Sequence, residues 1–459
     1  MKRIFLLLTL VIVPSLANAA NHYVLSSAQG NGSGTDWSNA CTDFTGSCSV
    51  NSLVRGDTYY VGTGTYGGRT FSTPSSGTAL ITIKGATVAD HGTDTGWAAA
   101  FSVRNADGGT QAKWTNEVDF TSSYWTFDGS VGPLWDTNPA DYGFRFADGL
   151  SRGSTIGVSG TVSNNGPALT NITISHIAAI ATSSDTEKEF IEGAISGGAH
   201  SNCTVSHSLL NGWQGLIMTK GQSGAAYSNW TISYNALLNG SSTSANHGEW
   251  IDPNERPIDS WTISFNLFKG YSGSAGMTGT IVANNSDNNN ARIYGNVFDG
   301  LRVGNGVITG TSQGNLNNAV VYNNTFLNMT SDSGDAIGGS GQGSGNVALN
   351  NLFYNTNANM GGGFSHDYNS FYSTSNTPSE SHGQTGSGNP FVNSAANNYQ
   401  LTADTAMWNL LAAPFNIDAD NTVRLSSRGA YQFSTTSGGG GGGGGGTVAP
   451  PTNLQALAQ

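Results

Sequence analysis

The chain has 459 residues and a formal net charge of −12, and charged side chains make up only 10% of it. A nucleic-acid-binding protein needs a basic surface, so this balance excludes a general nucleic-acid partner. Polarity comes mainly from Asn, Ser, Thr and Gly, which suits the exposed turns of a β-solenoid. A protein of this charge also needs help from a cation to hold a polyanion.

The N-terminus has the pattern of an export signal. Lys2 and Arg3 precede an apolar run over residues 4–13, and the small-residue motif Ala17–Ala19 follows. The run is shorter than the about 20 residues that cross a bilayer, so we predict a signal peptide over 1–19 and no membrane span. Loss of Lys2 and Arg3 takes the charge from −12 to −14. We therefore expect a secreted protein, extracellular or at the cell surface.

The segment after the signal is expected to close one end of the fold. Residues 20–55 precede the first clear strand, and a solenoid needs such a cap over its terminal strand. Cys41 and Cys48 are separated by six residues in this segment. In an exported protein this spacing favours a disulfide loop over a metal site, because no further Cys or His has suitable spacing nearby.

A short phrase of strand character recurs seven times between residues 171 and 350. The copies begin 27 to 31 residues apart, at Asn171, Asn202, Asn229, Ser260, Asn290, Asn318 and Asn346. The residues one and three positions on are apolar, as in Cys203 and Val205, so they are expected to face inward. A fixed period of this size marks a solenoid, and its strand character predicts stacked β-coils.

Two further strand signals follow each phrase. An Asn recurs at one corner, predicting a ladder of stacked side-chain amides: Asn235, Asn266, Asn296 and Asn324. The corner is followed by stretches that predict a third strand: Gly193–Ile195, Gly215–Ile217, Gly248–Ile251, Gly306–Ile308 and Ala336–Ile337. Equivalent positions hold His176, His207, Tyr234 and Phe265, which favours an aromatic stack over a metal site. Three strands in about 29 residues describe one coil of a parallel β-helix.

This pattern resembles the right-handed parallel β-helix proteins of the pectate-lyase-like superfamily. Residues 55–61 and 81–85 are similar to the first coil of such proteins, and residues 389–393 and 429–431 to the closing segment of secreted bacterial members. The resemblance implies an all-β fold, a right-handed parallel β-helix of roughly ten three-strand coils over 56–433. Fold alone does not specify a reaction.

The C-terminus reads differently from the repeats. Residues 434–451 contain nine consecutive glycines and are expected to form a flexible linker. The tail over 452–459, with the residues just before it, resembles the opening strand of a fibronectin-type-III-like module. Either the tail is vestigial or a further module follows in a longer chain.

The charged residues gather between Asp185 and Arg256. Glu192, Lys220 and Glu249 are spaced by 28 and 29 residues, about one coil each, and are expected to stack on one face at about 4.8 Å spacing. A uronate lyase needs a cation to neutralise the carboxylate, a base for the C5 proton and an acid for the leaving oxygen. We assign Lys220, Glu249 and Arg256 to catalysis.

Metal and substrate ligands follow from the same stretch. Carboxylate oxygens suit Ca²⁺, and the candidate ligands are Glu192, Glu249 and Asp252. The candidate substrate-binding residues are Trp213, Trp250 and His247. Residues 217–220 resemble an Ile-Ser-x-Lys phrase of alginate lyases and chondroitinase-B-like lyases. Trp213 and Gly215 occupy the positions at which those lyases have acidic residues. One coil later, Asn254 occupies the position at which they have the lysine.

Two functions are compatible with these residues. The first is a secreted protein that binds or processes an extracellular, possibly acidic, polysaccharide. Its enzymatic form is a Ca²⁺-dependent lyase or a hydrolase that uses Glu249 and Asp252. The alternative is a non-catalytic surface, adhesive or structural β-helix, in which the charged cluster is only a solvated face. The sequence leaves the glycan and the oligomeric state open.

Overall fold

The structure is a computed structural model. It describes residues 19–104, 110–146, 156–157, 168–181, 189–192, 198–212, 215–218, 226–240, 248–252, 256–271, 277–331, 335–341, 343–405, 414–424 and 427–433. Apart from residue 19, the predicted signal peptide over 1–19 lies outside these ranges, as do the linker over 434–451 and the tail over 452–459. No described helix is both long and apolar enough to cross a membrane.

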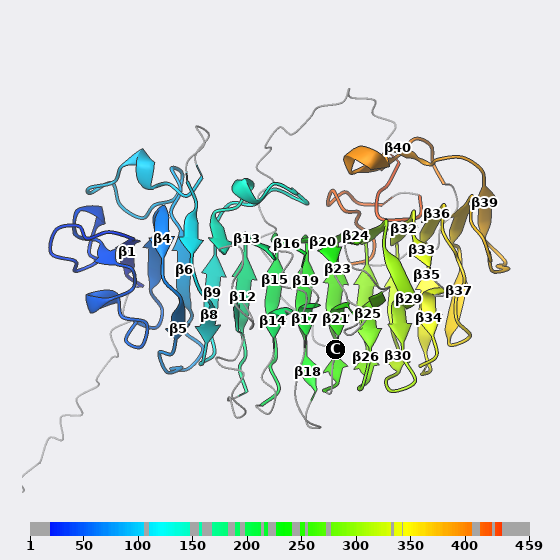
Figure 1. Ribbon diagram of the computed structural model, residues 1–459, viewed down its shortest axis with the longest axis horizontal. Coiled ribbons are helices and arrows are strands. Elements are labelled where there is room, and N and C mark those ends of the chain that lie inside the picture. Colours follow the sequence, from blue (N-terminus) through cyan, green and yellow to red (C-terminus); the bar gives the residue numbers. More distant parts are fainter. Residues whose placement is uncertain are drawn as a thin grey trace, which may run out of the picture.

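The described chain winds into coils that stack side by side along the long axis of the molecule (Figure 1). Three long sheets result, which we call sheets A, B and C. Sheet A has 13 strands: β2 (Cys41–Thr42), β1 (Asn21–Leu25), β3 (Thr58–Val61), β6 (Ile81–Gly85), β9 (Trp125–Asp128), β12 (Ile172–Ser175), β15 (Thr204–Ser206), β19 (Thr231–Ser233), β23 (Thr262–Ser264), β27 (Arg292–Tyr294), β31 (Val320–Tyr322), β35 (Asn346–Leu349) and β37 (Phe364–Asp367).

Sheet B has 12 strands: β39 (Gln384–Gly386), β38 (Ser370–Tyr372), β36 (Leu352–Tyr354), β32 (Thr325–Leu327), β28 (Val297–Asp299), β24 (Leu267–Tyr271), β20 (Ala236–Gly240), β16 (Leu209–Asn211), β13 (Ile177–Ile180), β10 (Phe144–Phe146), β7 (Ala112–Trp114) and β4 (Gly64–Tyr66). Sheet C has 10 strands: β33 (Thr330–Ser331), β34 (Asp335–Gly339), β29 (Arg302–Gly310), β25 (Met277–Ala283), β21 (Glu249–Asp252), β17 (Gly215–Met218), β14 (Glu189–Glu192), β11 (Ile156–Gly157), β8 (Val118–Phe120) and β5 (Arg69–Phe71).

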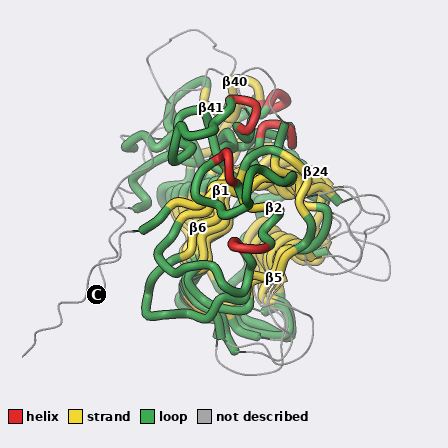
Figure 2. Tube along the Cα trace, turned by 90° about the vertical axis from the view of Figure 1, so that its left-hand side faces the viewer, coloured by secondary structure: helices red, strands yellow, loops and turns green. Residues whose placement is uncertain are grey.

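The remaining elements are short. Sheet D joins β18 (Tyr227–Ser228), β22 (Ile258–Asp259), β26 (Asn288–Asn289) and β30 (Leu316–Asn317), and a hairpin joins β40 (Phe391–Asn393) to β41 (Asn398–Leu401). The 3-10 helices are η1 (Trp37–Asn39), η2 (Gly46–Cys48), η3 (Ala99–Phe101), η4 (Pro139–Asp141) and η5 (Ser394–Ala396). Within sheets A to D every strand pair is parallel, and neighbours come from successive coils. The predicted parallel β-helix is thereby confirmed, and the end view superposes the strands into separate bundles (Figure 2).

The core lies inside the coils and follows the predicted inward positions. A column of aliphatic residues runs through sheet A in register, and each is at most 1% exposed: Ile174, Val205, Ile232, Ile263, Ile293 and Val321. Opposite it, Phe268, Phe298, Phe326, Phe353 and Phe371 stack with ring centroids 4.8–5.3 Å apart. Cys203 is buried beside this column, as expected of a small apolar side chain.

The seventh copy of the phrase is shifted by one residue from the prediction. Val321 pairs with Ala348, so Ala348 and not Leu349 takes the inward position. Asn346 consequently turns inward, where its amide donates to the carbonyl of Leu316 over 2.9 Å. Because side chains alternate between the faces of a strand, a one-residue slip exchanges inside and outside.

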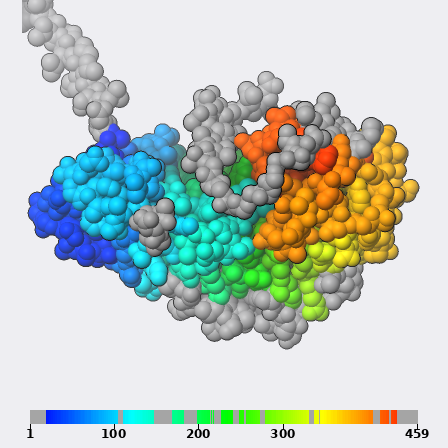
Figure 3. All heavy atoms as spheres, turned by 90° about the horizontal axis from the view of Figure 1, so that it is seen from above, coloured from blue at the N-terminus to red at the C-terminus, as the bar shows by residue number. Residues whose placement is uncertain are grey.

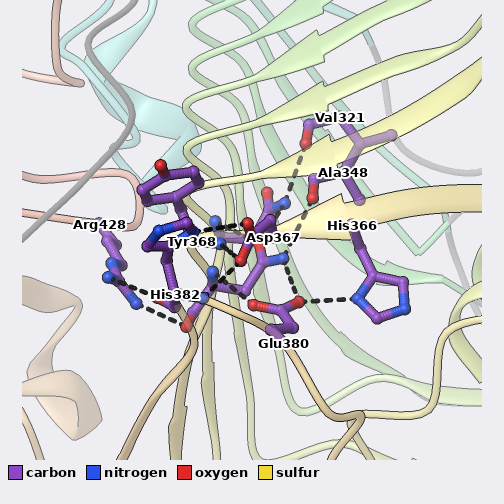
Figure 4. A network of polar contacts seen from close by, with 10 residues as sticks. Val321, Ala348, His366, Asp367, Tyr368, Glu380, His382 and Arg428 are labelled. Atoms are coloured by element: carbon purple, nitrogen blue, oxygen red, sulfur yellow. Dashed lines mark hydrogen bonds and ion pairs between the residues drawn. The ribbon is translucent and has the colours of Figure 1, made fainter.

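The Asn ladder at the corner between sheets A and B is confirmed and is longer than predicted. Six buried side chains follow one another: Asn235, Asn266, Asn296, Asn324, Asn351 and Asn369. From Asn266 on, each Oδ1 accepts hydrogen bonds from the backbone amide and the Nδ2 of the preceding Asn, at 2.8–3.1 Å. At the far end Asn369 donates to Glu380, which also contacts His366 (Figure 4). Every amide dipole therefore points the same way, toward a carboxylate.

The predicted aromatic stack is confirmed as well. His176, His207, Tyr234 and Phe265 follow one another with ring centroids 5.0 Å apart. All four have positive φ, so they also turn the chain at the corner. Burial, followed by the charge of His176, lowers the pKa of His207 to about 4. These histidines are corner residues of the aromatic stack.

The outer face of sheet B is covered by the chain that follows the last coil. After β39 the chain returns over coils formed much earlier, seen as orange and red atoms over green and yellow ones (Figure 3). Tyr399 and Tyr431 pack there against the outward residues Leu267 and Val297, and Trp135 joins them from the opposite direction. This return segment falls within the predicted range 56–433. Sheet B therefore has no open outer face over these coils.

The N-terminal segment covers the first coil, and its predicted disulfide is present. β1 lies between β2 and β3 in sheet A, and Cys41 is bonded to Cys48. Both cysteines are fully buried. Closing a loop of seven residues removes chain entropy from the unfolded state, which corresponds to about 2–3 kcal/mol.

We expect the double variant Cys41→Ser, Cys48→Ser to lower the free energy of unfolding by about 2–3 kcal/mol. Urea unfolding of the wild type and the variant, each with and without reductant, measures this. Reductant should lower the free energy of unfolding of the wild type to about that of the variant, and it should not change the value for the variant. If the wild type and the variant were equally stable without reductant, the disulfide would not stabilise the fold.

Candidate active site on sheet C

The register of sheet C follows a column of isoleucines, of which Ile217, Ile251, Ile281 and Ile308 belong to the core. Ile191, Ile217, Ile251, Ile281 and Ile308 pair in succession through β14, β17, β21, β25 and β29. The first of these strands is Glu189–Glu192, not the predicted stretch 193–195, which lies outside the described residues.

The predicted stack of Glu192, Lys220 and Glu249 is therefore wrong. Glu192 pairs with Met218, and Met218 pairs with Asp252, so these three form one column. Glu249 belongs instead to the column of Glu189 and Gly215. Lys220 lies outside the described residues, two positions beyond Met218. The loops between strands vary in length, so a spacing near one coil does not guarantee alignment.

Glu249 and Asp252 lie at the two ends of β21, and the charge of Glu249 acts on Asp252. Trp250 and Ile251, which lie between them, belong to the core. Met218 and Val282 flank Asp252 in the adjacent strands. Glu249 pairs with Gly279 in β25, and the register places Gly215 of β17 on its other side.

The surroundings of Asp252 disfavour its charged form. Asp252 is 1% exposed, and Glu249 is 6% exposed. Burial first, and then the negative charge of Glu249, raise the pKa of Asp252 well above its usual range. Neither carboxylate oxygen of Asp252 has a hydrogen-bond partner of normal geometry among the described residues, although Asn284 lies near enough to lower its pKa slightly. The pair therefore favours a state in which Asp252 holds a proton.

Arg256 follows β21 in the chain and precedes β22 of sheet D by two residues. It is buried, and its guanidinium carbon lies 5.5 Å from the ring centroid of Tyr227. His200 packs against the other side chains of this corner, and burial, followed by the charge of Arg256, lowers its pKa to about 3. The position against Tyr227 gives Arg256 a structural role in this corner, and its catalytic role stays a prediction.

Trp250 is not a sugar-stacking platform. Its side chain is fully buried in the core, where it stacks on Phe268 with ring centroids 5.8 Å apart. The chain bends between sheets B and C here, so Trp250 and Ile251 both reach the core although they are adjacent. The other two candidate substrate ligands, Trp213 and His247, lie outside the described residues.

A calcium site is not complete in the part of the chain that the structure describes. Ca²⁺ takes six to eight oxygen ligands, and Glu249 and Asp252 offer two carboxylates. Glu192 is two strands away from Asp252 in its column. No group of three or more His, Cys, Asp or Glu side chains suited to a metal occurs among the described residues. The carboxylates of Glu249 and Asp252 alone do not fit Ca²⁺.

Sequence reasoning missed the role of the neighbours of Asp252. Met218 pairs with Asp252 from β17, Val282 follows Ile281 in β25, and Asn284, just after β25, lies near enough to lower the pKa of Asp252. The signal for the first two was present in the isoleucine column, since each follows an inward Ile by one residue. Asn284 carried no recognisable signal.

The chain has distant matches among solved structures. No family model and no curated protein matches the chain. Among solved structures, the pectate lyase Pel9A has 13% sequence identity and a TM-score of 0.42. The alignment covers 92% of this chain and 98% of Pel9A. XylC, in complex with xylose, has 10% identity and a TM-score of 0.42, over 89% and 98%. A mannuronic-acid-specific family 6 lyase from the human gut microbiota has 14% identity and a TM-score of 0.37, over 76% and 89%.

Proposed function

We propose that this protein is secreted and processes an acidic extracellular polysaccharide, with Glu249 and Asp252 as its acid–base pair. The observation that supports this most is the raised pKa of Asp252, which shares strand β21 of sheet C with a second carboxylate, Glu249. An ionised carboxylate without partners in such a place costs stability, so a purely structural role would not favour it. Two carboxyl groups whose pKa values are pushed apart supply one base and one acid at the same pH.

For a uronate-containing glycan the pair would carry out a β-elimination. Glu249, the more exposed member, takes the proton from C5 of the uronate, and the electron pair forms the C4–C5 double bond. The bond from C4 to the leaving oxygen breaks, and Asp252 gives its proton to that oxygen. Transfer of the proton from Glu249 to Asp252 restores the pair. The proton lost by the sugar thus ends on the leaving group.

Other residues complete the proposed site. Lys220 and Arg256 are the cations that would neutralise the uronate carboxylate, and Trp213 and His247 would contact the sugar. Ca²⁺ would serve the same neutralising purpose if residues beyond the described ranges complete its ligands. In the hydrolytic version, Asp252 protonates the leaving oxygen and Glu249 activates water or attacks the sugar.

The low exposure of the pair favours a second candidate. Asp252 is 1% exposed and Glu249 6%. A non-catalytic glycan-binding or structural β-helix is compatible with carboxylates this well covered. The two candidates differ in one result, which is whether a glycan is cleaved.

The experiment follows product from several acidic glycans. Mature protein is incubated with alginate, pectate and chondroitin, each with Ca²⁺ or with a chelator, and unsaturated product and reducing ends are measured separately. We expect cleavage of one acidic glycan, lowered about 10²–10⁴-fold in Glu249→Gln because a general base contributes that much. Asp94→Asn, which removes a carboxylate whose side chain is 98% exposed, should cleave normally. Absence of product from the whole panel, or a fully active Glu249→Gln, favours the non-catalytic candidate.

A further inference from the structure

Sheet A, unlike sheet B, presents a groove on its outer face. A depression of about 430 Å³ crosses β19, β23, β27 and β31. We call it the sheet A groove, and its lining is Asn229, Trp230, Thr231, Ser260, Thr262, Asn290, Arg292, Asn318 and Val320. Trp230 is buried beneath it, so amides, hydroxyls and one guanidinium supply most of the accessible surface. Four strands about 4.8 Å apart span roughly 14 Å, the length of a short oligosaccharide.

The polar groups of the groove stand in two regular rows. One row continues an outward threonine column that runs through seven strands in register: Thr58, Thr82, Thr126, Thr173, Thr204, Thr231 and Thr262. The second row consists of turn residues with positive φ, which point away from the sheet: Asn229, Ser260, Asn290 and Asn318. The groove therefore offers hydroxyl and amide groups at the same interval over successive coils.

Arg292 interrupts the threonine row. It takes the position after Thr262 in register and is followed by Val320. Its side chain is exposed and makes no hydrogen bond or ion pair with any described residue. Among the described lysines and arginines, only Lys113 likewise has a side chain without a hydrogen bond or ion pair. Arg69, Lys84 and Lys269, by contrast, form ion pairs with aspartates. An unpaired guanidinium in a groove of a protein with net charge −12 is available to an anionic ligand.

Asp259, an acid bonded to two residues of the groove lining, forms no ion pair with Arg292. Asp259, at the end of β22, accepts hydrogen bonds from Asn290 at 2.6 Å and from Ser260 at 3.3 Å. Asp259 thus fixes two members of the amide and hydroxyl row. Its charge also disfavours a densely charged polyanion in this groove, while one carboxylate at Arg292 is accommodated.

We propose that the sheet A groove binds an acidic oligosaccharide that lies across the coils, with one sugar carboxylate on Arg292 and its hydroxyls on the threonine and asparagine rows. A nucleic acid would need several cations, and an apolar ligand would need exposed apolar side chains, of which Val320 is the main one. A polyhydroxylated ligand with sparse carboxylates matches the lining.

This site is distinct from the acid–base pair, because the groove lies on sheet A and the pair on sheet C. It rests on the proposed function only for the class of ligand, and its role is to hold a long glycan while another part of the chain is processed. Binding at the groove does not require that Glu249 and Asp252 act on the sugar.

The test measures binding without turnover. Alginate and polygalacturonate oligosaccharides are titrated calorimetrically into mature protein that carries Glu249→Gln. We expect one of them to bind, and Arg292→Ala in that background to weaken binding about tenfold or more, through loss of a charge-assisted hydrogen bond. Val320→Glu, which places a carboxylate in register beside Arg292, should weaken binding further. An oligosaccharide whose carboxyl groups have been reduced should bind weakly to the Glu249→Gln parent. Its affinity should match that of the acidic oligosaccharide for the Arg292→Ala variant.

Lys113→Ala is the matched control, because Lys113 is exposed and lies on β7 of sheet B, away from the groove. It should bind as the parent does. Equal affinity of Arg292→Ala and the parent, an equal loss in Lys113→Ala, or absence of binding by the parent would each overturn the groove proposal. A fully active Glu249→Gln enzyme with binding that still depends on Arg292 would sink the acid–base pair and leave the groove standing.

Discussion

Replacing Asp252 by Asn is expected to abolish glycan cleavage while making the folded protein more stable at neutral pH. Asn has the shape of a protonated Asp but cannot donate an acidic proton, so the rate of cleavage should fall about 10²–10⁴-fold. Stability should rise because the unfolded state ionises Asp252 freely, whereas the folded state penalises its charge. Each unit of pKa difference corresponds to about 1.4 kcal/mol.

The pH dependence of this effect has a definite sign. The folded pKa of Asp252 lies above the unfolded value, so the folded state binds its proton more tightly. The contribution of Asp252 to stability is fully present below about pH 4, where both states are protonated. It is lost as pH rises from there through the folded pKa. Wild type and Asp252→Asn should therefore be closest in stability at acidic pH and diverge toward neutral pH.

Urea unfolding at a series of pH values, beside product formation, checks both parts. Asp94→Asn again serves as the control, because Asp94 is exposed and should affect neither stability nor cleavage appreciably. A variant Asp252→Asn that unfolds more easily than the wild type at neutral pH would show instead that the charged carboxylate stabilises the fold.

Replacing Asn296 by Ala is expected to lower the free energy of unfolding by about 3–5 kcal/mol. Asn296 is fully buried in the corner ladder, and its Nδ2 donates to the carbonyl of Ile263 over 2.8 Å. Its Oδ1 accepts from the backbone amide and the Nδ2 of Asn266. Alanine leaves these groups buried without partners, and each such group costs about 1–3 kcal/mol.

Asn318→Gly is the matched control for the ladder. Asn318 is an exposed turn residue with φ of 53°, a conformation that glycine adopts without strain. Its replacement should change stability by less than about 0.5 kcal/mol. Similar urea midpoints for Asn296→Ala and the wild type would show that the amides contribute little beyond water's own hydrogen bonds.

The coils could be predicted from the sequence because one physical requirement repeats in every strand. A residue three positions into each phrase must fill the core, and Ile263 or Ile293 satisfies this whatever the loops do. The corner Asn was predictable for a similar reason, since only an amide both donates and accepts along a stack. The slip at Asn346 arose because an Asn at the inward position imitates the turn Asn that opens the other copies.

The candidate site was less predictable because it depends on alignment between strands. Counting residues placed Glu192 beside Lys220, but pairing through Ile191 and Ile217 places Glu192 beside Met218. A longer or shorter loop changes the number of residues in a coil but does not change which strand residues pair. The burial of Trp250 depends on a bend between two sheets, and neither its chemistry nor its neighbours in the sequence reveals that bend.

The most direct test of the acid–base pair is a titration of the two carboxyl groups. Mature protein with ¹³C-labelled Asp and Glu carboxyl carbons is followed by NMR across pH, and Asp252→Asn and Glu249→Gln assign the two signals. The account predicts that Asp252 stays protonated well above the range in which exposed aspartates ionise, and that Glu249→Gln lowers its pKa by removing a negative charge. An Asp252 that ionises near pH 4, unaffected by Glu249→Gln, would contradict the pair as the reactive centre.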